Sequence, residues 1–317
     1  MNTTTLGDDG PSVGRIGLGC MGMSWAYDEP GRDDAESVRV IHRALDLGVT
    51  LIDTADAYGP FTNEYLVGRA LAGHRDRAVL ATKAGLVVDG TRTMHRNGRP
   101  EHIAACIDAS LLRLRTDHID LYQLHRVDPA VPLEESWGAM AEAVQAGKAR
   151  ALGLSEVTVA EIARAQAIHP VASVQSEASL WSRDIQDNGV LAHTAAHGIA
   201  LLPFSPLGRG FLTGAIRTTA DLPPGDWRHG NPRFQPAEIH TNQRLVDTVR
   251  TIAARLDATP AQVALAWLLA LGPHVVPIPG TKNPARLNEN AAAADLSLPD
   301  DARKELDSLP APATARY

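Results

Sequence analysis

The side chains best suited to chemistry are an aspartate, a tyrosine, a lysine and a histidine in the first half of the chain. Asp53, Lys83 and His125 each end a short apolar run, and Tyr58 follows Asp53 in the loop TADAYGP. A lysine is rarely buried at a strand end unless a carboxylate pairs with it, so Asp53 is the expected partner of Lys83. Taken singly, each residue also fits an ordinary polar strand end.

Together these four side chains predict proton transfer to a carbonyl oxygen. An ammonium at Lys83 close to Tyr58 would stabilise the phenolate and lower the tyrosine pKa from its usual ~10. A tyrosine tuned in this way can protonate a carbonyl oxygen as it becomes an alkoxide, and His125 can hydrogen-bond the same oxygen. Carbonyl reduction or alcohol oxidation of this kind requires a hydride carrier.

The elements that must position these side chains alternate regularly along the sequence. Short apolar or β-branched runs are separated by segments with helical spacing of apolar residues. This alternation predicts a parallel sheet, and eight such units predict a (β/α)8 TIM barrel, whose catalytic residues lie at the C-terminal ends of the strands. No composition shift marks a second domain, so we expect one domain over residues 1–317. The strand candidates are 15–20, 49–53, 78–83, 118–125, 149–154, 172–177, 199–204 and 274–278.

The expected helices occupy the segments between these strands. The last two strands are separated by a segment that begins with a loop at 206–238, which contains five glycines and five prolines. A loop of this length is usually functional in a compact enzyme. The helix candidates are 34–47, 63–72, 101–115, 134–146, 158–168, 188–197, 240–256 and 260–271, with an extra C-terminal helix near 299–309 across the bottom or side of the barrel.

Composition excludes several classes of protein. The chain has 317 residues, of which 44% are hydrophobic and 21% charged, so it can bury a large core. A net charge of −7 without a basic cluster argues against nucleic-acid and anionic-membrane partners. No apolar run approaches the ~20 residues of a membrane span. The N-terminus lacks the features of a signal peptide, and the two cysteines are far apart, which together predict a cytoplasmic protein.

Two short motifs resemble ligand-binding patterns, but the residues around them do not fit those patterns. GLGCMG at 17–22 has the glycine spacing of a dinucleotide-binding turn, but a loop rather than a helix is expected after it. His193 and His197 have the spacing of a metal pair, yet no third ligand is evident. We therefore expect neither a Rossmann site nor a bound metal.

Several segments in order along the chain resemble the aldo-keto reductases, especially bacterial NADP-dependent members with the SPLGRGFLTG loop. The resemblance implies a reversible reduction of aldehydes or ketones by NADPH, with Tyr58 as acid/base, Asp53 and Lys83 as its tuning pair and His125 as substrate orienter. The matching segments are IDTADAYGPFTNEYLVGRAL at 52–71, LATKAG around Lys83, DLYQLHRVDP at 120–129, ALGLSE at 151–156, VQSEASL at 174–180, FSPLGRGFLTG at 204–214 and IPGTKNPARLNEN at 278–290.

The same resemblance implies residues for each part of the cofactor. Ser155 and Gln175 would hydrogen-bond the nicotinamide amide, and Phe204 would stack on its ring. Glu156 stands where asparagine is commoner, and Ala178 where tyrosine is. The pyrophosphate would lie against backbone amides of the glycine-containing loop. The remaining implied cofactor residues are Gly19 and Met21, the loop Ser205, Pro206, Leu207, Gly208, Arg209 and Gly210, the 2′-phosphate set Gly280, Thr281, Lys282 and Arg286, and Glu289 and Asn290 near adenine.

The choice between NADPH and NADH depends on Lys282 and Arg286. These cations are four residues apart at the start of a helix, so both can face one anion. The helix N-terminus would add partial positive charge and free N–H groups. We expect an NADPH preference of at least ~10-fold. The alternative is a pair of solvated charges on an exposed helix.

Two other functions stay open on the sequence alone. The chain could be a nicotinamide-binding redox sensor or regulatory subunit with incidental turnover, or a barrel hydrolase or lyase that uses Asp53 and Lys83 without a nicotinamide. The filled catalytic positions favour the reductase. The substrate is a small carbonyl compound or alcohol whose pocket we expect from Trp25, Tyr27 and the loops 86–100 and 211–238.

Overall fold

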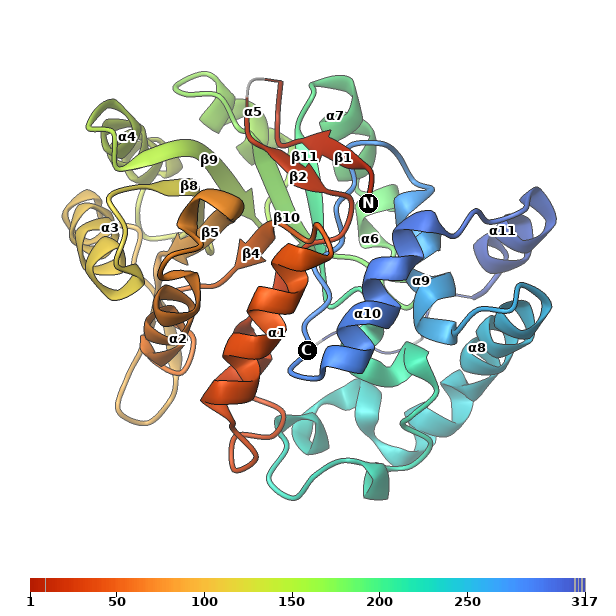
Figure 1. The fold of residues 1–317 in the computed structure, drawn as a ribbon. Coiled ribbons are helices and arrows are strands. Elements are labelled where there is room, and N and C mark those ends of the chain that lie inside the picture. Colours follow the sequence, from red (N-terminus) through yellow and green to blue (C-terminus); the bar gives the residue numbers. More distant parts are fainter. Residues whose placement is uncertain (9, 311, 313, 315, 317) are drawn as a thin grey trace.

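A parallel sheet curled into a barrel forms the centre of the molecule, with helices packed around it (Figure 1). The computed structural model describes residues 1–8, 10–310, 312, 314 and 316. Its strand order β11-β10-β9-β8-β5-β4-β3 follows the chain around the barrel, as the sequence predicted for a (β/α)8 TIM barrel. The strands are β3 (Leu18–Gly19), β4 (Leu51–Asp53), β5 (Val79–Ala84), β8 (Ile119–Leu124), β9 (Ala149–Ser155), β10 (Ser173–Glu177) and β11 (Ala200–Phe204).

The eighth predicted strand, 274–278, closes the barrel only through isolated bridges, so this prediction is corrected. The amides of Val276 and Ile278 donate to carbonyls of β11 at 2.8 and 3.0 Å. On the β3 side, Pro277 and Pro279 have no N–H and only accept, at 2.9 and 3.3 Å. The prolines thus remove half of the donors that a regular ladder would need.

The helices lie close to their predicted positions. The predicted helix at 188–197 begins at Val190, because Gly189 has a φ of +81°. The 206–238 loop contains several 3-10 turns, and the following helix starts at Pro236 rather than at 240. The helices are α1 (Asp34–Asp46), α2 (Thr62–Leu71), α3 (Pro100–Leu114), α4 (Leu133–Gln145), α5 (Val159–Gln166), α6 (Asp184–Asp187), α7 (Val190–Ala196), α8 (Pro236–Arg255), α9 (Pro260–Leu269), α10 (Pro284–Ala292) and α11 (Asp300–Asp307).

The extra C-terminal helix packs on the side of the barrel. In Figure 1, α11 lies at the periphery beside α8 and α9, and the Trp267 indole of α9 donates to the Asp307 carboxylate at 2.8 Å.

The 3-10 turns are η1 (Met21–Met23), η2 (Arg75–Arg77), η3 (Gly208–Thr213), η4 (Thr219–Asp221), η5 (Trp227–Gly230), η6 (Pro232–Phe234) and η7 (Ala293–Asp295).

Two short hairpins were not predicted. The first hairpin pairs β1 (Thr3–Thr5) with β2 (Ser12–Gly14) and covers the N-terminal ends of the barrel strands. It brings Leu6 and Val13 into the apolar cluster inside the barrel. The second, β6 (Leu86–Val88) with β7 (Met94–Arg96), gives the 86–100 loop a defined shape at the opposite end. None of the helices in the described part of the chain is long and apolar enough to cross a membrane.

Candidate active site

A buried ion pair anchors the site at the C-terminal ends of neighbouring strands. Lys83 of β5 donates to Asp53 Oδ1 of β4 at 2.6 Å and to the Thr54 carbonyl at 2.8 Å. The other carboxylate oxygen accepts from the amides of Gln123 on β8 and Gln175 on β10, at 3.2 and 2.9 Å. Both charged side chains are almost fully buried. Four strands therefore hold this pair in a single arrangement.

Tyr58 reaches the ion pair from the loop after β4. Lys83 Nζ lies 3.3 Å from the Tyr58 hydroxyl and 5.0 Å from the centre of its ring. The His125 ring packs edge-on against Tyr58 with centroids 5.7 Å apart, and the Trp25 ring is tilted by 49° to the Tyr58 ring with centroids 6.3 Å apart. The structure thus brings the four predicted side chains together.

The pKa of Tyr58 departs from the sequence-based expectation. Burial raises this pKa above its ordinary value, and the positive charge of Lys83 offsets only part of the rise. The expected lowering by Lys83 is therefore wrong for the net shift. For Lys83 itself, burial works to lower the pKa, but attraction to Asp53 and Tyr58 outweighs it and raises the pKa. The tyrosine is consequently protonated and the lysine charged at neutral pH.

His125 is held in its neutral form. Burial lowers its pKa well below the ordinary value, and the charges of Lys83 and Arg126 add to the effect. Its Nδ1 is buried with no hydrogen-bond partner among the described residues. A neutral imidazole beside Tyr58 can donate a hydrogen bond to a substrate oxygen, with the tautomer set by that partner.

Arg126 is a site residue that the sequence analysis missed. It donates to the His125 carbonyl at 2.6 Å and to the Ser155 hydroxyl at 3.0 Å, and its guanidinium lies 6.0 Å from the centre of the Phe204 ring. Ser155 and Phe204 are two of the residues implied for the nicotinamide. The position of Arg126 directly after His125 in the QLHR run was the available signal.

The two glutamines beside Asp53 also refine the prediction. Gln175 uses its amide nitrogen on Asp53 and on Gln123 Oε1, at 2.9 and 3.3 Å, so its oxygen is the atom left to accept from a carboxamide. Gln123 was not predicted. Its signal was a polar residue two positions after Leu121, which belongs to the cluster inside the barrel.

The 205–210 loop differs from the expected array of free amides. The N–H groups of Gly208 and Gly210 donate within the loop, to the carbonyls of Ser205 at 2.9 Å and Leu207 at 3.0 Å. The Arg209 side chain turns inward and makes two bonds to the buried Glu177 carboxylate, at 3.0 and 2.7 Å. A pyrophosphate in this loop would thus meet fewer free amides than the sequence suggested. Pro206 has no N–H to offer.

Gly19 and Gly280 meet where the barrel closes. A Cβ on Gly19 would lie 3.0 Å from the Ile278 carbonyl oxygen, and one on Gly280 would lie 3.1 Å from the Gly19 oxygen. Close approach of the two backbones therefore explains both glycines without a ligand. Met21 follows as the first residue of η1 and is half-buried.

Lys282 is engaged by the loop before α1. Its ammonium donates to the Asp28 carboxylate at 2.8 Å, to the Asp28 carbonyl at 3.1 Å and to the Gly31 carbonyl at 3.0 Å. An ammonium has three donors, so all are used here. Lys282 lies before the helix rather than in its first turn. Its bond to Asp28 holds the pKa of that carboxyl below the usual value.

The start of α10 also lacks the free N–H groups that were expected. Pro284 has none, and those of Ala285 and Arg286 donate to the side chain of Asn283 at 2.9 and 3.1 Å. Arg286 is exposed on the rim of a pocket of about 280 Å³. That pocket is lined by Gly31, Asp33, Glu36, Lys282, Asn283 and Arg286.

The other residues that were expected near the adenosine are Thr281, Glu289 and Asn290. Thr281 accepts the amide of Asn283 at 3.1 Å, Glu289 is half-buried and Asn290 is buried. An aromatic ring, a hydroxyl and an amide are thus available for a nicotinamide, whereas of the two cations expected at the 2′-phosphate only Arg286 has no partner among the described residues to exchange.

The two discounted motifs have structural roles. GLGCMG runs from β3 into the turn η1 and then into loop. The rings of His193 and His197 stack with centroids 4.0 Å apart. In the described part of the chain no three histidine, cysteine or acidic side chains are grouped to hold a metal.

Comparisons with known proteins identify the family of the chain. The family model described as "Aldo/keto reductase family" matches residues 15–311. A "Probable aldo-keto reductase 1" from Glycine max is 40% identical over 307 residues, which cover 96% of this chain and 88% of that protein.

Solved structures give the same result. The glycerol dehydrogenase AKR11B4 from Gluconobacter oxydans superposes with a TM-score of 0.87 at 32% identity, over 96% of this chain and 93% of that one. The holo form of the aldo-keto reductase AKR11C1 from Bacillus halodurans gives 0.80 at 26% identity, over 99% and 98%. On the family match and these relatives, the chain belongs to the aldo/keto reductase family and is an oxidoreductase.

Proposed function

We propose that this protein reduces aldehydes or ketones to alcohols, reversibly, with NADPH as hydride donor. The observation that carries the proposal is the contact of Lys83 with both Asp53 and the Tyr58 hydroxyl, beside a neutral His125. NADPH, when bound, supplies a hydride to the carbonyl carbon. The name of the Gluconobacter relative, a glycerol dehydrogenase, supports an alcohol–carbonyl couple.

Tyr58 is the proposed general acid. Because burial raises its pKa, the hydroxyl keeps its proton at neutral pH and can deliver it to a carbonyl oxygen. Lys83 then stabilises the phenolate that remains, which is where its charge matters most. In alcohol oxidation the same phenolate takes the proton back.

His125 and the ion pair supply orientation. The neutral imidazole donates a hydrogen bond to the carbonyl oxygen and so fixes it near the Tyr58 hydroxyl. Asp53 keeps Lys83 charged and in place through the bond at 2.6 Å. The two glutamine amides hold Asp53 in turn, so the donor set is preorganised rather than assembled on binding.

The cofactor residues that we propose are those implied by the resemblance, with one condition set by the contacts. The Ser155 hydroxyl accepts from Arg126, which leaves its own hydrogen and a second lone pair for a carboxamide. Lys282 must exchange at least one of its bonds to Asp28 and Gly31 to reach a 2′-phosphate. Arg286 has no such requirement, because it is exposed at the pocket rim.

The substrate pocket is supported by the aromatic contacts above Tyr58. Trp25 lies beside Tyr58, and Tyr27 packs on Trp227 of the 211–238 segment with centroids 6.1 Å apart. Arg92 of the 86–100 loop lies over Trp25 at 5.9 Å. We also propose a single domain in the cytoplasm, supported by the continuous family match and by two cysteines that form no disulfide.

A panel of aldehydes, ketones and sugars with NADPH tests the proposal. We expect many turnovers per molecule of enzyme on at least one aromatic aldehyde, followed by nicotinamide absorbance at saturating cofactor. Tyr58→Phe should sharply reduce this turnover. Tyr65→Phe is its matched control, because Tyr65 is exposed on α2. Cofactor binding without turnover on any member of the panel would instead indicate a nicotinamide-binding regulatory protein.

A further inference from the structure

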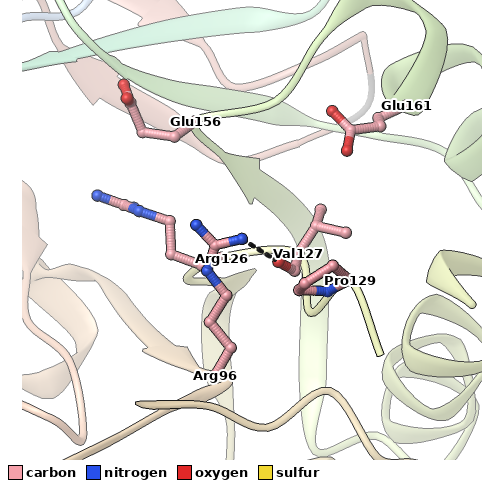
Figure 2. Close-up of a pocket in the computed structure, with 6 residues that line it drawn as sticks. All are labelled: Arg96, Arg126, Val127, Pro129, Glu156 and Glu161. Atoms are coloured by element: carbon pink, nitrogen blue, oxygen red, sulfur yellow. Dashed lines mark hydrogen bonds between the residues drawn. The ribbon is translucent and has the colours of Figure 1, made fainter. Parts of the chain in front are cut away.

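A second pocket opens beside the candidate active site, at the C-terminal edge of the barrel. Figure 2 shows its six lining residues, Arg96, Arg126, Val127, Pro129, Glu156 and Glu161, around a volume of about 160 Å³. Arg96 ends β7, Glu161 lies in α5, and the others belong to the loops after β8 and β9. The proposed mechanism gives no role to Arg96.

The two arginines of this pocket bond to neutral acceptors, although the charge of Arg96 also helps to lower the pKa of Asp128. Arg96 donates to the Val127 carbonyl at 3.1 Å, which Figure 2 marks, and Arg126 donates to a carbonyl and a hydroxyl. Within the described part of the chain neither forms an ion pair. A guanidinium has five donors, so both arginines keep spare capacity.

The two carboxylates of the pocket are already engaged. Glu156 accepts from the Glu177 amide at 2.7 Å and lies 3.3 Å from the Arg316 guanidinium. Glu161 accepts from the amide and hydroxyl of Thr158 at 2.7 and 2.8 Å, as the cap of α5. In Figure 2 both lie across the cavity from the arginines. Glu156 is thus balanced by Arg316, and the two arginines outnumber the remaining carboxylate of Glu161, so the lining is positive on balance.

The pocket is connected to the reacting centre through Arg126. That residue follows His125 directly and contacts Ser155 at the end of β9. The positive charge of Arg126 acts on the site residues: it helps to lower the pKa of His125, and it offsets part of the rise in the pKa of Tyr58. Arg126 therefore links the pocket to the edge of the barrel at which the substrate carbonyl would lie.

We propose that Arg96 and Arg126 bind an oxyanion on the substrate, so that the preferred substrates are aldehydes or ketones carrying a carboxylate or a phosphate ester. Guanidinium groups recognise both by charge-assisted, often bidentate hydrogen bonds. This inference rests on the proposed reductase function and assigns its substrate class. Neither arginine takes part in the chemical step.

Paired substrates test the proposal. We compare succinic semialdehyde with its methyl ester, and meta-carboxybenzaldehyde with its methyl ester, each by kcat/KM at saturating NADPH. The expected acid-to-ester ratio is at least ~10 and falls as salt is added. Glyceraldehyde phosphate against glyceraldehyde forms the second arm, and the larger of the two preferences identifies the oxyanion. A ratio near one in both arms would overturn the proposal, as would a preference for aldehydes that carry an amine.

Three variants assign the preference to this pocket. Arg96→Gln and Arg126→Gln should each bring the ratio close to one, mainly through the KM of the acid. Arg99→Gln is the matched control, because Arg99 is exposed three residues from Arg96 and does not line the pocket. An acid preference that survives both pocket variants would place the anion elsewhere.

Direct binding separates this inference from the reductase function. Succinate has no aldehyde or ketone group to reduce, so calorimetric titration of the NADPH-loaded enzyme, whose proposed phosphate contacts are already occupied, reports on anion binding without turnover. Binding to the wild type that weakens at least ~5-fold in both arginine variants supports the pocket even if no aldehyde is turned over. Turnover of neutral aldehydes together with no succinate binding would leave the reductase function standing and remove the anion pocket.

Discussion

The two charged regions that the proposed reaction needs are built in opposite ways. Lys83 and Asp53 are buried and come from barrel strands, and they bond to each other, to Tyr58, to the Thr54 carbonyl and to glutamine amides of two other barrel strands. Lys282 and its partner Asp28 retain 31% and 38% exposure and come from segments outside the regular strands. A buried pair is costly to break, whereas an exposed pair contributes little and exchanges partners readily. The fold thus holds the proposed catalytic pair rigidly and leaves the proposed 2′-phosphate contacts adjustable.

Lys83→Met should give the largest loss. It removes the charge that stabilises the Tyr58 phenolate and leaves Asp53 buried without its counter-ion, at a cost of ~3–5 kcal/mol in the free energy of unfolding. Activity should fall by about three orders of magnitude. Denaturant unfolding and steady-state kinetics measure the two effects.

The matched control for that variant is Lys148→Met. Lys148 pairs with Asp108 on the surface, so its loss should cost less than ~1 kcal/mol. Adding Asp53→Asn to Lys83→Met should recover part of the stability and none of the activity. A double variant no more stable than Lys83→Met would contradict the pairing.

Asp56 gives a pH-dependent test of the buried region. Burial and the nearby Glu64 raise the pKa of Asp56 to about 7, and its Oδ1 has no partner among the described residues. Between about pH 4 and pH 7 the unfolded chain therefore releases this proton first, and stability falls as the pH rises through that window. Asp56→Asn removes this loss.

The measurement is the free energy of unfolding of wild type and Asp56→Asn at about pH 5 and about pH 8. From about pH 5 to about pH 8, the free energy of unfolding of the variant should rise by on the order of 2–3 kcal/mol relative to that of the wild type. If the stability of both proteins depends on pH in the same way, Asp56 does not have a raised pKa in the folded protein.

Lys282→Ala with Arg286→Ala tests the exposed region. We expect the wild type to bind NADPH at least ~10-fold more tightly than NADH. In the double variant most of this preference should disappear, because NADPH binds more weakly while NADH binding changes little. The free energy of unfolding should change by less than ~1 kcal/mol, and added salt should reduce the wild-type ratio. Tryptophan fluorescence quenching measures both affinities. Equal affinities in the wild type would mean that these residues are ordinary surface charges.

Asp28→Asn should have the smallest effect, in the opposite direction. It weakens the strongest bond that holds Lys282, so NADPH affinity should rise ~2–5-fold with little change for NADH. The gain should vanish when Lys282→Ala is also present. An unchanged or lower NADPH affinity would show that Asp28 does not compete with the cofactor.

The sequence predicted the barrel and the four clustered side chains because both follow from local patterns. Apolar runs define seven regular strands, and residues at successive strand ends must meet at one rim. The proline-containing eighth segment has the same apolar pattern, but it cannot form a full ladder.

What the sequence missed depends on contacts or on balances of opposing effects. The bond from Lys282 to Asp28 joins residues 254 positions apart, and no local pattern indicates it. The sign of the Tyr58 pKa shift required the depth of burial, which outweighs the nearby charge. Arg126 and Gln123 lie in a recognised segment, yet their partners come from other strands.

Single-turnover hydride transfer in wild type and Tyr58→Phe tests the central claim most directly. NADPH bound to each enzyme is mixed with a reactive aldehyde, and the rate of nicotinamide oxidation is recorded. We predict NADPH affinity within about twofold of wild type and a transfer rate at least ~100-fold lower, because the proton is needed chiefly in the transition state. A variant that retains more than about a tenth of the wild-type transfer rate would contradict the assignment of Tyr58 as the acid.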